Sequence, residues 1–336
     1  MYKHSIWIAA PVLAACMSLG LAQQTADTIL HNGKILTVDS NFSTAQAVAA
    51  ATAEAGGATR MMGLSAVSEW WPRGQCLMDI EYGGGTKGAS IKANYFSEWY
   101  NQAARDGLRS ANVHVSGDET HSRVISELER IDRARPGSVK GWAIDHCNLI
   151  DPRDIPRAAK LGLMWSCSLG GAVNSQVAEA FGEEALHTYA VPIKSMLDAG
   201  INVSLEGEGA GGLWGALEIL IRRTDEEGRV WGADQRVDRE TALRIATQNG
   251  ANYVLKGDRL GSIEPGKLAD LVVLDRDYMS IPEDDIAETR SLLTLLGGKF
   301  IFLHPDFANE YNLRPAGAVI STLEDLQARR PRSANN

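Results

Sequence analysis

Short apolar runs alternate with amphipathic stretches through the middle of the chain. Runs typical of β-strands cover residues 75–82, 111–117, 141–147, 162–168 and 201–207. Apolar positions at helical spacing cover residues 119–134, 213–223 and 238–250. Because strands that alternate with helices are typical of βαβ units, the pattern predicts an α/β fold with a parallel sheet.

The helical spacing is clearest in residues 119–134. The apolar positions of this stretch are Val124, Ile125, Leu128 and Ile131. Asp118 directly precedes it, so we expect the Asp118 side chain to cap the amino end of the helix. In the last helical stretch, Gly250 predicts the carboxyl end.

Both ends of the chain carry β-rich patterns. Residues 27–39 read DTILHNGKILTVD, in which Asn32-Gly33 predicts a hairpin turn. Residues 292–303 read LLTLLGGKFIFL and repeat the pattern around Gly297-Gly298. A further apolar strand is predicted at residues 270–275.

These terminal strands predict a small domain built from both ends of the chain. We expect residues 23–50 and 256–326 to form one composite β-sandwich. The βαβ units of residues 51–255 are then an insertion between its two halves. Residues 327–336 are expected to be a disordered tail.

The first 22 residues have the composition of a secretory signal peptide. A short basic start is followed by an apolar run and by small residues, and the run is too short and too broken for a membrane span. Leu13-Ala14-Ala15-Cys16 resembles a lipobox, which would place a lipid anchor on Cys16, whereas ordinary cleavage would follow Ala22. Both alternatives predict an exported protein that is periplasmic, secreted or lipid-anchored.

The composition is that of an ordinary globular protein. Of the 336 residues, 44% are hydrophobic and 22% are charged, and the net charge of −9 argues against nucleic acid as a partner. Three cysteines follow the leader, namely Cys76, Cys147 and Cys167. Their odd number argues against a disulfide framework, and their apolar surroundings predict buried thiols.

Several groups able to take part in catalysis lie at the ends of the predicted strands, where active sites of parallel α/β proteins form. They are His114, Asp118, His146, Glu206 and Glu208. Imidazole nitrogen and carboxylate oxygen can bind a divalent ion, which activates a bound water. The alternative for each is a structural histidine or a solvated loop acid.

The order of these segments resembles the amidohydrolase superfamily, in the branch of N-substituted formamide deformylase-like and imidazolonepropionase-related enzymes. Three quoted segments carry the resemblance beside DTILHNGKILTVD: VHVSGDETHSRVISELERI (113–131), IDHCNLIDPRDIPRAAKLGLMWSCS (144–168) and GSIEPGKLADLVVLD (261–275). The resemblance implies a (β/α)8 TIM-like barrel that hydrolyses amide or cyclic-amide C–N bonds with a metal-activated water.

By motif match, the resemblance implies residue roles as well. His114 and His146 fall where the family's fifth- and sixth-strand metal ligands lie, and zinc suits histidine ligands best. Glu208, and after it Glu206, matches the catalytic carboxylate of the eighth strand. Asp118 is a candidate to orient an imidazole.

The chain also departs from the family pattern. The family's first barrel strand carries an H-x-H metal motif, and none occurs among the seven histidines here. A full barrel takes about 250 residues, more than residues 51–255 provide, which predicts an incomplete barrel. Such a chain could close its sheet as a homodimer, be a degenerate relative without metal, or keep a reduced mononuclear site.

Three functions therefore stay open at this point. The first is an exported hydrolase of a small amide-like substrate with a divalent metal. The second is a catalytically degenerate binding protein. The third is a metal-free hydrolase in which a histidine and a glutamate activate water directly.

Overall fold

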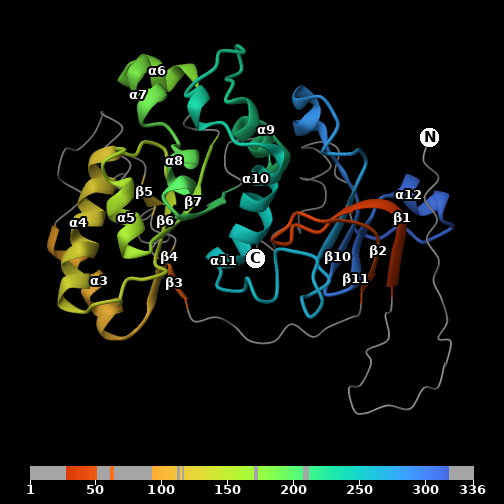
Figure 1. Cartoon of the computed structure of the whole chain (residues 1–336), viewed down its shortest axis with the longest axis horizontal. Helices are drawn as coiled ribbons and strands as arrows, with labels where there is room; N and C mark the ends of the chain where they lie inside the picture. The colour runs from red at the N-terminus through yellow and green to blue at the C-terminus, as the bar shows by residue number, and fades with distance from the viewer. Residues whose placement is uncertain are drawn as a thin grey trace, which may run out of the picture.

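The computed structural model shows two neighbouring regions, one of parallel strands and helices and one of antiparallel strands (Figure 1). It describes residues 28–50, 61–63, 93–111, 114–115, 117–169, 173–206 and 212–317. The predicted leader 1–22, strand 75–82, Cys76, Glu208 and tail 327–336 lie outside the described residues. Within the described ranges, no helix is both long and apolar enough to span a membrane.

A four-stranded parallel sheet forms the centre of the first region. Its strands are β5 (His114–Val115), β6 (Ala143–His146), β7 (Met164–Cys167) and β8 (Asn202–Leu205), in that order. The predicted strands at 141–147, 162–168 and 201–207 are confirmed. The predicted run 111–117 contains the end of a separate strand β4 (Arg109–Ala111), which pairs with β3 (Met61–Gly63), and then β5.

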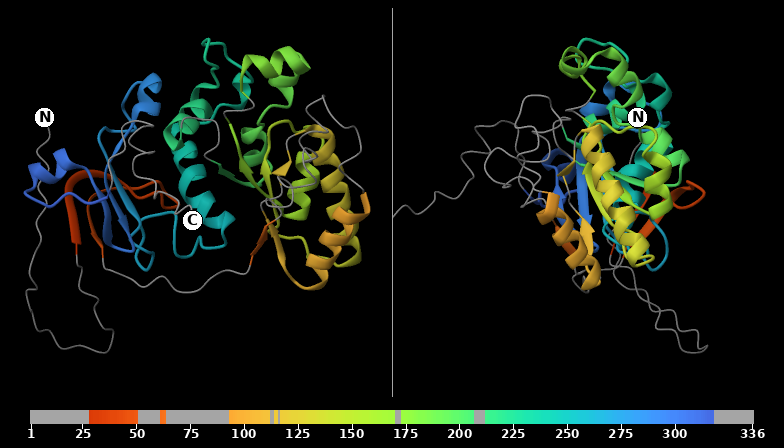
Figure 2. Two further views of the ribbon diagram at one scale, coloured as in Figure 1. Left: turned by 180° about the vertical axis from the view of Figure 1, so that it is seen from behind. Right: turned by 90° about the vertical axis from the view of Figure 1, so that its left-hand side faces the viewer.

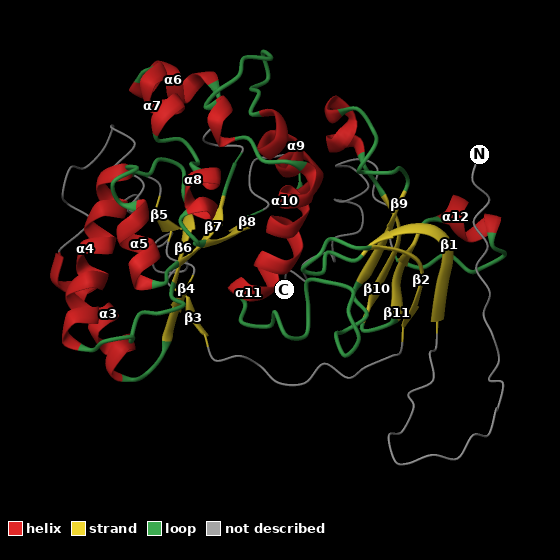
Figure 3. Cartoon of the chain, in the orientation of Figure 1, coloured by secondary structure: helices red, strands yellow, loops and turns green. Residues whose placement is uncertain are grey.

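Helices cover both faces of this sheet (Figure 3). They are α3 (Ala93–Arg105), α4 (Asp118–Ala134), α5 (Ile155–Leu161), α6 (Ser175–Phe181), α7 (Glu183–Thr188), α8 (Ile193–Asp198), α9 (Leu213–Arg222), α10 (Arg239–Arg244), the π-helical segment η2 (Ile245–Asn249) and α11 (Gly250–Tyr253). The side chains of Ile144, Trp165 and Val203 enter the main core with α4, α5 and α8. The opposite face meets α11, whose Tyr253 packs with Ala143 and Met164. At the free edge of β8, Asn249 Nδ2 of η2 donates to the Val203 carbonyl at 2.9 Å.

The helices at 119–134 and 213–223 are confirmed, but two predicted helix ends are wrong. Gly117, not Asp118, is the amino-terminal cap of α4, and no side chain caps it. The helix predicted to end at Gly250 continues through η2 and α11 to Tyr253, because this segment packs against β7 and β8 instead of turning away.

The second region is antiparallel. Strand β1 (Thr28–Leu36) pairs with β2 (Thr44–Ala50), and β10 (Ser291–Leu296) lies between β9 (Leu271–Leu274) and β11 (Lys299–Leu303). Helix α12 (Pro305–Glu310) follows β11. The buried side chains of Leu293, Leu295 and Leu303 form a core of their own with this helix.

The two predicted hairpins had opposite outcomes. Gly297 and Gly298 both have positive φ and join β10 to β11, which confirms the tight turn. Asn32-Gly33 is not a turn, because β1 runs through it with a register shift between His31 and Ile35. The pairing with β2 continues on both sides of this irregularity, so the dipeptide forms an interruption within one strand.

Segments from opposite ends of the chain meet in this region, as Figures 1 and 2 show for β1, β2, β10 and β11. Leu30 of β1 packs against the core around Leu293. Lys34 pairs with Asp277 at 3.1 Å. The two ends of the chain thus contribute strands that pack against one another, and their union in one β-sandwich domain stays a prediction.

Candidate functional site

The candidate site lies at the carboxyl ends of the parallel strands. His146 is the last residue of β6, and Glu206 directly follows β8. Strand β7 lies between them, and its Cys167 is opposite His146 in the β6–β7 register. The carboxyl ends of parallel strands meet at one edge of a sheet, which is why residues 60 positions apart in sequence become neighbours.

His146 and Glu206 form a two-point contact. The Nδ1 atom of His146 lies 2.9 Å from Oε2 of Glu206, and the backbone N–H of His146 donates to Oε1 at 2.8 Å. The His146 side chain is 5% exposed and that of Glu206 15%. A buried carboxylate that accepts the Nδ1 proton fixes the ring orientation and leaves the lone pair on Nε2.

The backbone at this pair is unusual. His146 has φ of 80° and the next residue, Cys147, has φ of 53°. Both are left-handed conformations that residues other than glycine rarely adopt. The Ser168 N–H donates to the His146 carbonyl at 2.9 Å, so β7 helps to hold this turn.

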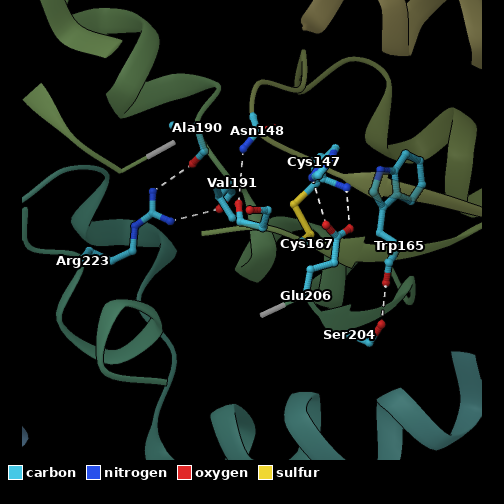
Figure 4. Close-up of a disulfide and its surroundings, with 11 residues drawn as sticks. Cys147, Asn148, Trp165, Cys167, Ala190, Val191, Ser204, Glu206 and Arg223 are labelled. Atoms are coloured by element: carbon cyan, nitrogen blue, oxygen red, sulfur yellow. Dashed lines mark hydrogen bonds and ion pairs between the residues drawn. A yellow bond between two sulfur atoms is a disulfide. The ribbon is translucent and has the colours of Figure 1, made fainter. Parts of the chain in front are cut away.

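A disulfide joins Cys147 to Cys167 directly beside the pair (Figure 4). The prediction of buried residues is confirmed, because both cysteines are 0% exposed, but the prediction of free thiols is wrong. The register explains the correction, since it brings the residue after β6 next to the end of β7. Disulfides persist in oxidising compartments, so this bond is compatible with export. The export itself, which residues 1–22 predict, stays a prediction.

A second buried polar group lies one residue before His146. The Tyr253 hydroxyl donates to Asp145 Oδ1 at 2.6 Å, and the Arg109 guanidinium lies 5.2 Å from the centre of the Tyr253 ring. Burial raises the pKa of Asp145 to about 7, against the lowering effect of the Tyr253 bond, and the charge of Glu206 adds to the rise. In the β5–β6 register His114 is opposite this residue.

His121 of α4 lies near the same edge and is fully buried. Its Nδ1 is 2.8 Å from the Gly117 carbonyl, and its ring faces the Trp165 ring at 6.2 Å between centres. Burial lowers the pKa of His121 to about 4. This packing gives His121 a structural position in the core.

We expect His121 to make folding stability fall in mild acid. Its pKa in the unfolded chain is about 6.5, so protonation favours the unfolded state as the pH falls from there towards the folded pKa of about 4. The loss is of the order of 3 kcal/mol. Urea unfolding at pH 7 and pH 4.5 measures it. His121→Leu should lose this part of the pH dependence, and an unchanged dependence in that variant would contradict the assignment.

The structure brings some of the predicted site residues together and leaves others apart or undescribed. His146 and Glu206 are brought together, whereas Asp118 is exposed at the first residue of α4. Glu208 and the side chain of His114 lie outside the described residues, so their roles stay predictions. The predictions missed the disulfide, Asp145 and Tyr253. Two cysteines at the carboxyl ends of neighbouring strands were a usable signal for the disulfide.

The fit of a metal ion can be judged from the donors that are described. His146 with a carboxylate on its Nδ1 is the arrangement that orients metal-bound imidazoles in proteins. Across the described ranges, however, no three histidine, cysteine, aspartate or glutamate side chains are grouped to hold a metal ion. The described part of the site therefore provides an oriented imidazole, and metal binding by His114 and Glu208 stays a prediction.

Comparison with known proteins gives a family match over most of this region. A family model described as "Amidohydrolase family" matches residues 71–302. N-substituted formamide deformylase from Arthrobacter pascens is 30% identical over 217 residues, which cover 62% of this chain and 40% of that protein. 5-Methylthioadenosine/S-adenosylhomocysteine deaminase from Syntrophobacter fumaroxidans is 27% identical over 177 residues, covering 48% and 36%.

Among solved structures, an uncharacterized metal-dependent hydrolase from Pyrococcus horikoshii aligns with a TM-score of 0.48 and 21% sequence identity. The alignment covers 58% of this chain and 39% of that one. The chain spans about two fifths of the length of the two curated relatives named above.

Proposed function

Because the chain belongs to the amidohydrolase family, we propose that it hydrolyses a C–N bond in a small amide-like substrate. In this proposal β5 to β8 are one side of a (β/α)8 barrel, whose carboxyl end receives the substrate. The names of the deformylase and the deaminase describe two reactions that break C–N bonds, and they support this class of chemistry.

The observation that carries the proposal is the contact between His146 and Glu206. The carboxylate holds the ring through Nδ1 and holds the backbone of the same residue through its N–H. The orientation of the ring and the backbone of His146 are therefore both held before a substrate arrives. A side chain held in this way can act on a reactant without first losing conformational entropy.

The reaction follows from the tautomer. Nε2 of His146 takes a proton from a water molecule whose oxygen bonds to the carbonyl carbon of the substrate. Glu206 stabilises the imidazolium that forms, because its carboxylate lies 2.9 Å from Nδ1 in a nearly buried site. The C–N bond then breaks, and His146 returns the proton to the leaving nitrogen. The products are a carboxylic acid and an amine.

The same contact supports a second arrangement with a divalent ion. His114, His146 and Glu208 would hold the ion, and zinc suits this donor set best. A bound ion would polarise the carbonyl and lower the pKa of a water molecule. Glu206 would keep its role in either arrangement, because it orients His146 through the nitrogen that binds neither ion nor water.

The test combines turnover with metal content. The purified protein is incubated with a panel of N-formyl amines, linear amides and cyclic amides, and released amine and acid are quantified by mass spectrometry. Elemental analysis is carried out on the same sample and on the His114→Ala/His146→Ala variant. We expect turnover of at least one member of the panel and none in the variant.

The outcomes separate the alternatives. About one metal equivalent per chain, lost in the double variant, supports the arrangement with an ion. Turnover without stoichiometric metal supports His146 as the direct base. A stable, folded protein that cleaves no member of the panel contradicts the hydrolase and favours a binding protein.

A further inference from the structure

We propose that the Cys147–Cys167 disulfide positions the His146–Glu206 pair. The bond holds the left-handed turn after β6 in the one conformation that presents His146 to Glu206. This inference rests on the proposed function for the importance of the pair, but the positioning itself can be measured without any substrate.

Each cysteine of the bond is connected to the backbone of one member of the pair. Cys147 is the residue after His146, so the direction of its backbone sets the direction of the His146 carbonyl. Cys167 lies opposite His146 in the register, and its own carbonyl accepts the Glu206 N–H at 3.0 Å. A single covalent bond therefore links the segment that carries the imidazole to the segment that anchors the carboxylate. Figure 4 shows Glu206 beside this bond.

The turn needs such a link because it is intrinsically unfavourable. His146 and Cys147 are consecutive residues with positive φ, and neither is glycine. Residues in this region persist only when their surroundings impose the conformation. The surroundings here are the Ser168 N–H on the His146 carbonyl, the Glu206 carboxylate on the His146 N–H, and the disulfide.

The place of the bond argues against a role in joining the strands. β6 and β7 already pair through four residues, from Ala143 with Met164 to His146 with Cys167. One end of the disulfide, Cys147, lies one residue beyond this ladder in the left-handed turn, and the other end, Cys167, is the last residue of β7. The disulfide therefore adds constraint to the turn, while the strands are held without it.

The burial of both cysteines indicates a structural disulfide and not a redox switch. Both cysteines are 0% exposed and lie in the main core beside Leu149 and Trp165. A reductant cannot reach the sulfur atoms while the protein is folded. The bond, formed during folding, therefore constrains the folded protein permanently. Its effect is tested by substitution of the cysteines.

The test follows the Nδ1 proton of His146 by NMR in protein labelled with ¹⁵N-histidine. In the wild type we expect a downfield signal that exchanges slowly with water, because the proton is shared with a buried carboxylate. In Cys147→Ala/Cys167→Ala we expect the signal to exchange at least about tenfold faster or to disappear. On a member of the amide panel that the wild type cleaves, the kcat of this variant should be lower by about tenfold or more, with KM nearly unchanged.

A second variant separates backbone positioning from plain cross-linking. Glycine adopts positive φ without cost, so Cys147→Gly/Cys167→Ala should recover part of the Nδ1 signal that the alanine variant loses. A bond that only cross-links the core predicts the reverse, since glycine makes the chain more flexible than alanine does. If the substituted chains do not fold, the wild type refolded in reductant supplies the same comparison with both thiols intact.

Leu293→Ala is the matched control. Leu293 is fully buried in the core of the antiparallel region, so its truncation lowers the melting temperature without touching the pair. We expect the Nδ1 signal and kcat to survive in this variant at equal loss of stability. The proposal is overturned if the disulfide-free variants keep the wild-type signal and kcat and lose only melting temperature. If the wild type cleaves no substrate but the signal still depends on the bond, the proposed function fails and the positioning stands.

Discussion

Replacing His146 with alanine is expected to lower kcat/KM for the amide substrate by roughly 10²- to 10⁴-fold. The variant lacks the nitrogen that takes the proton from water in the first arrangement of the site and that would hold the ion in the second. The Glu206 carboxylate also loses its Nδ1 partner, but it keeps the backbone N–H of residue 146 at 2.8 Å. Steady-state kinetics on the folded variant measure the effect, and circular dichroism checks the fold.

Two further variants test whether the effect of His146→Ala comes from the His146–Glu206 pair. Glu206→Gln keeps the shape of the side chain but removes the charge that stabilises the imidazolium, so it should lower kcat more than it raises KM. Asp198→Asn is the control, because Asp198 is a surface carboxylate that pairs with Lys194 far from the pair. Activity of His146→Ala within about tenfold of the wild type would show that another group carries the chemistry.

Replacing Arg223 with leucine is expected to reduce the free energy of unfolding by about 3 to 5 kcal/mol. Arg223 is 0% exposed, and its guanidinium donates to the Trp231 carbonyl at 2.9 Å. It also donates to the carbonyls of Val191 and Ala190 at 3.1 and 2.8 Å (Figure 4). Burial lowers its pKa to about 10, so the group stays charged at neutral pH. Leucine fills part of the space but removes the guanidinium donor from the Ala190 and Trp231 carbonyls, whereas the Val191 carbonyl keeps the Ile193 N–H at 2.7 Å.

Urea unfolding of Arg223→Leu beside Arg236→Leu measures this contribution. Arg236 is exposed, and its guanidinium donates to the Arg222 carbonyl, so its loss should change stability by about 0.5 kcal/mol or less. A loss below about 1 kcal/mol for Arg223→Leu would mean that the Ala190 and Trp231 carbonyls find other partners. The loops that hold Val191 and Trp231 would then not depend on this arginine.

The sequence was sufficient for most of the fold. The strands after residues 141, 162 and 201 are buried on both faces, so their apolar runs were visible without knowledge of the tertiary structure. Helix α4 was predicted for a similar reason, because Val124, Ile125, Leu128 and Ile131 all enter the core. Local turn chemistry was less reliable. Asn32-Gly33 favours a turn, but pairing with β2 on both sides outweighs that preference.

Half of the candidate site followed from the same reasoning. His146 and Glu206 were found because strand ends define where catalytic groups collect in parallel sheets. The bond between Tyr253 and Asp145 could not be predicted, because it joins residues 108 positions apart through a helix that was expected to end earlier. The disulfide was missed because the odd number of cysteines argues against a disulfide framework. The positions of two of them at the ends of neighbouring strands are the better guide.

The meeting of β1 with β9 to β11 has a consequence for biosynthesis. A ribosome that adds about 5 to 20 residues per second completes the last of these strands tens of seconds after the first has left the exit tunnel. Until then β1 and β2 are a two-stranded hairpin, which is marginally stable at best in water. The order of synthesis therefore favours early folding of the parallel sheet and its helices, and the nascent chain must keep its first hairpin from pairing elsewhere until its final partners are made.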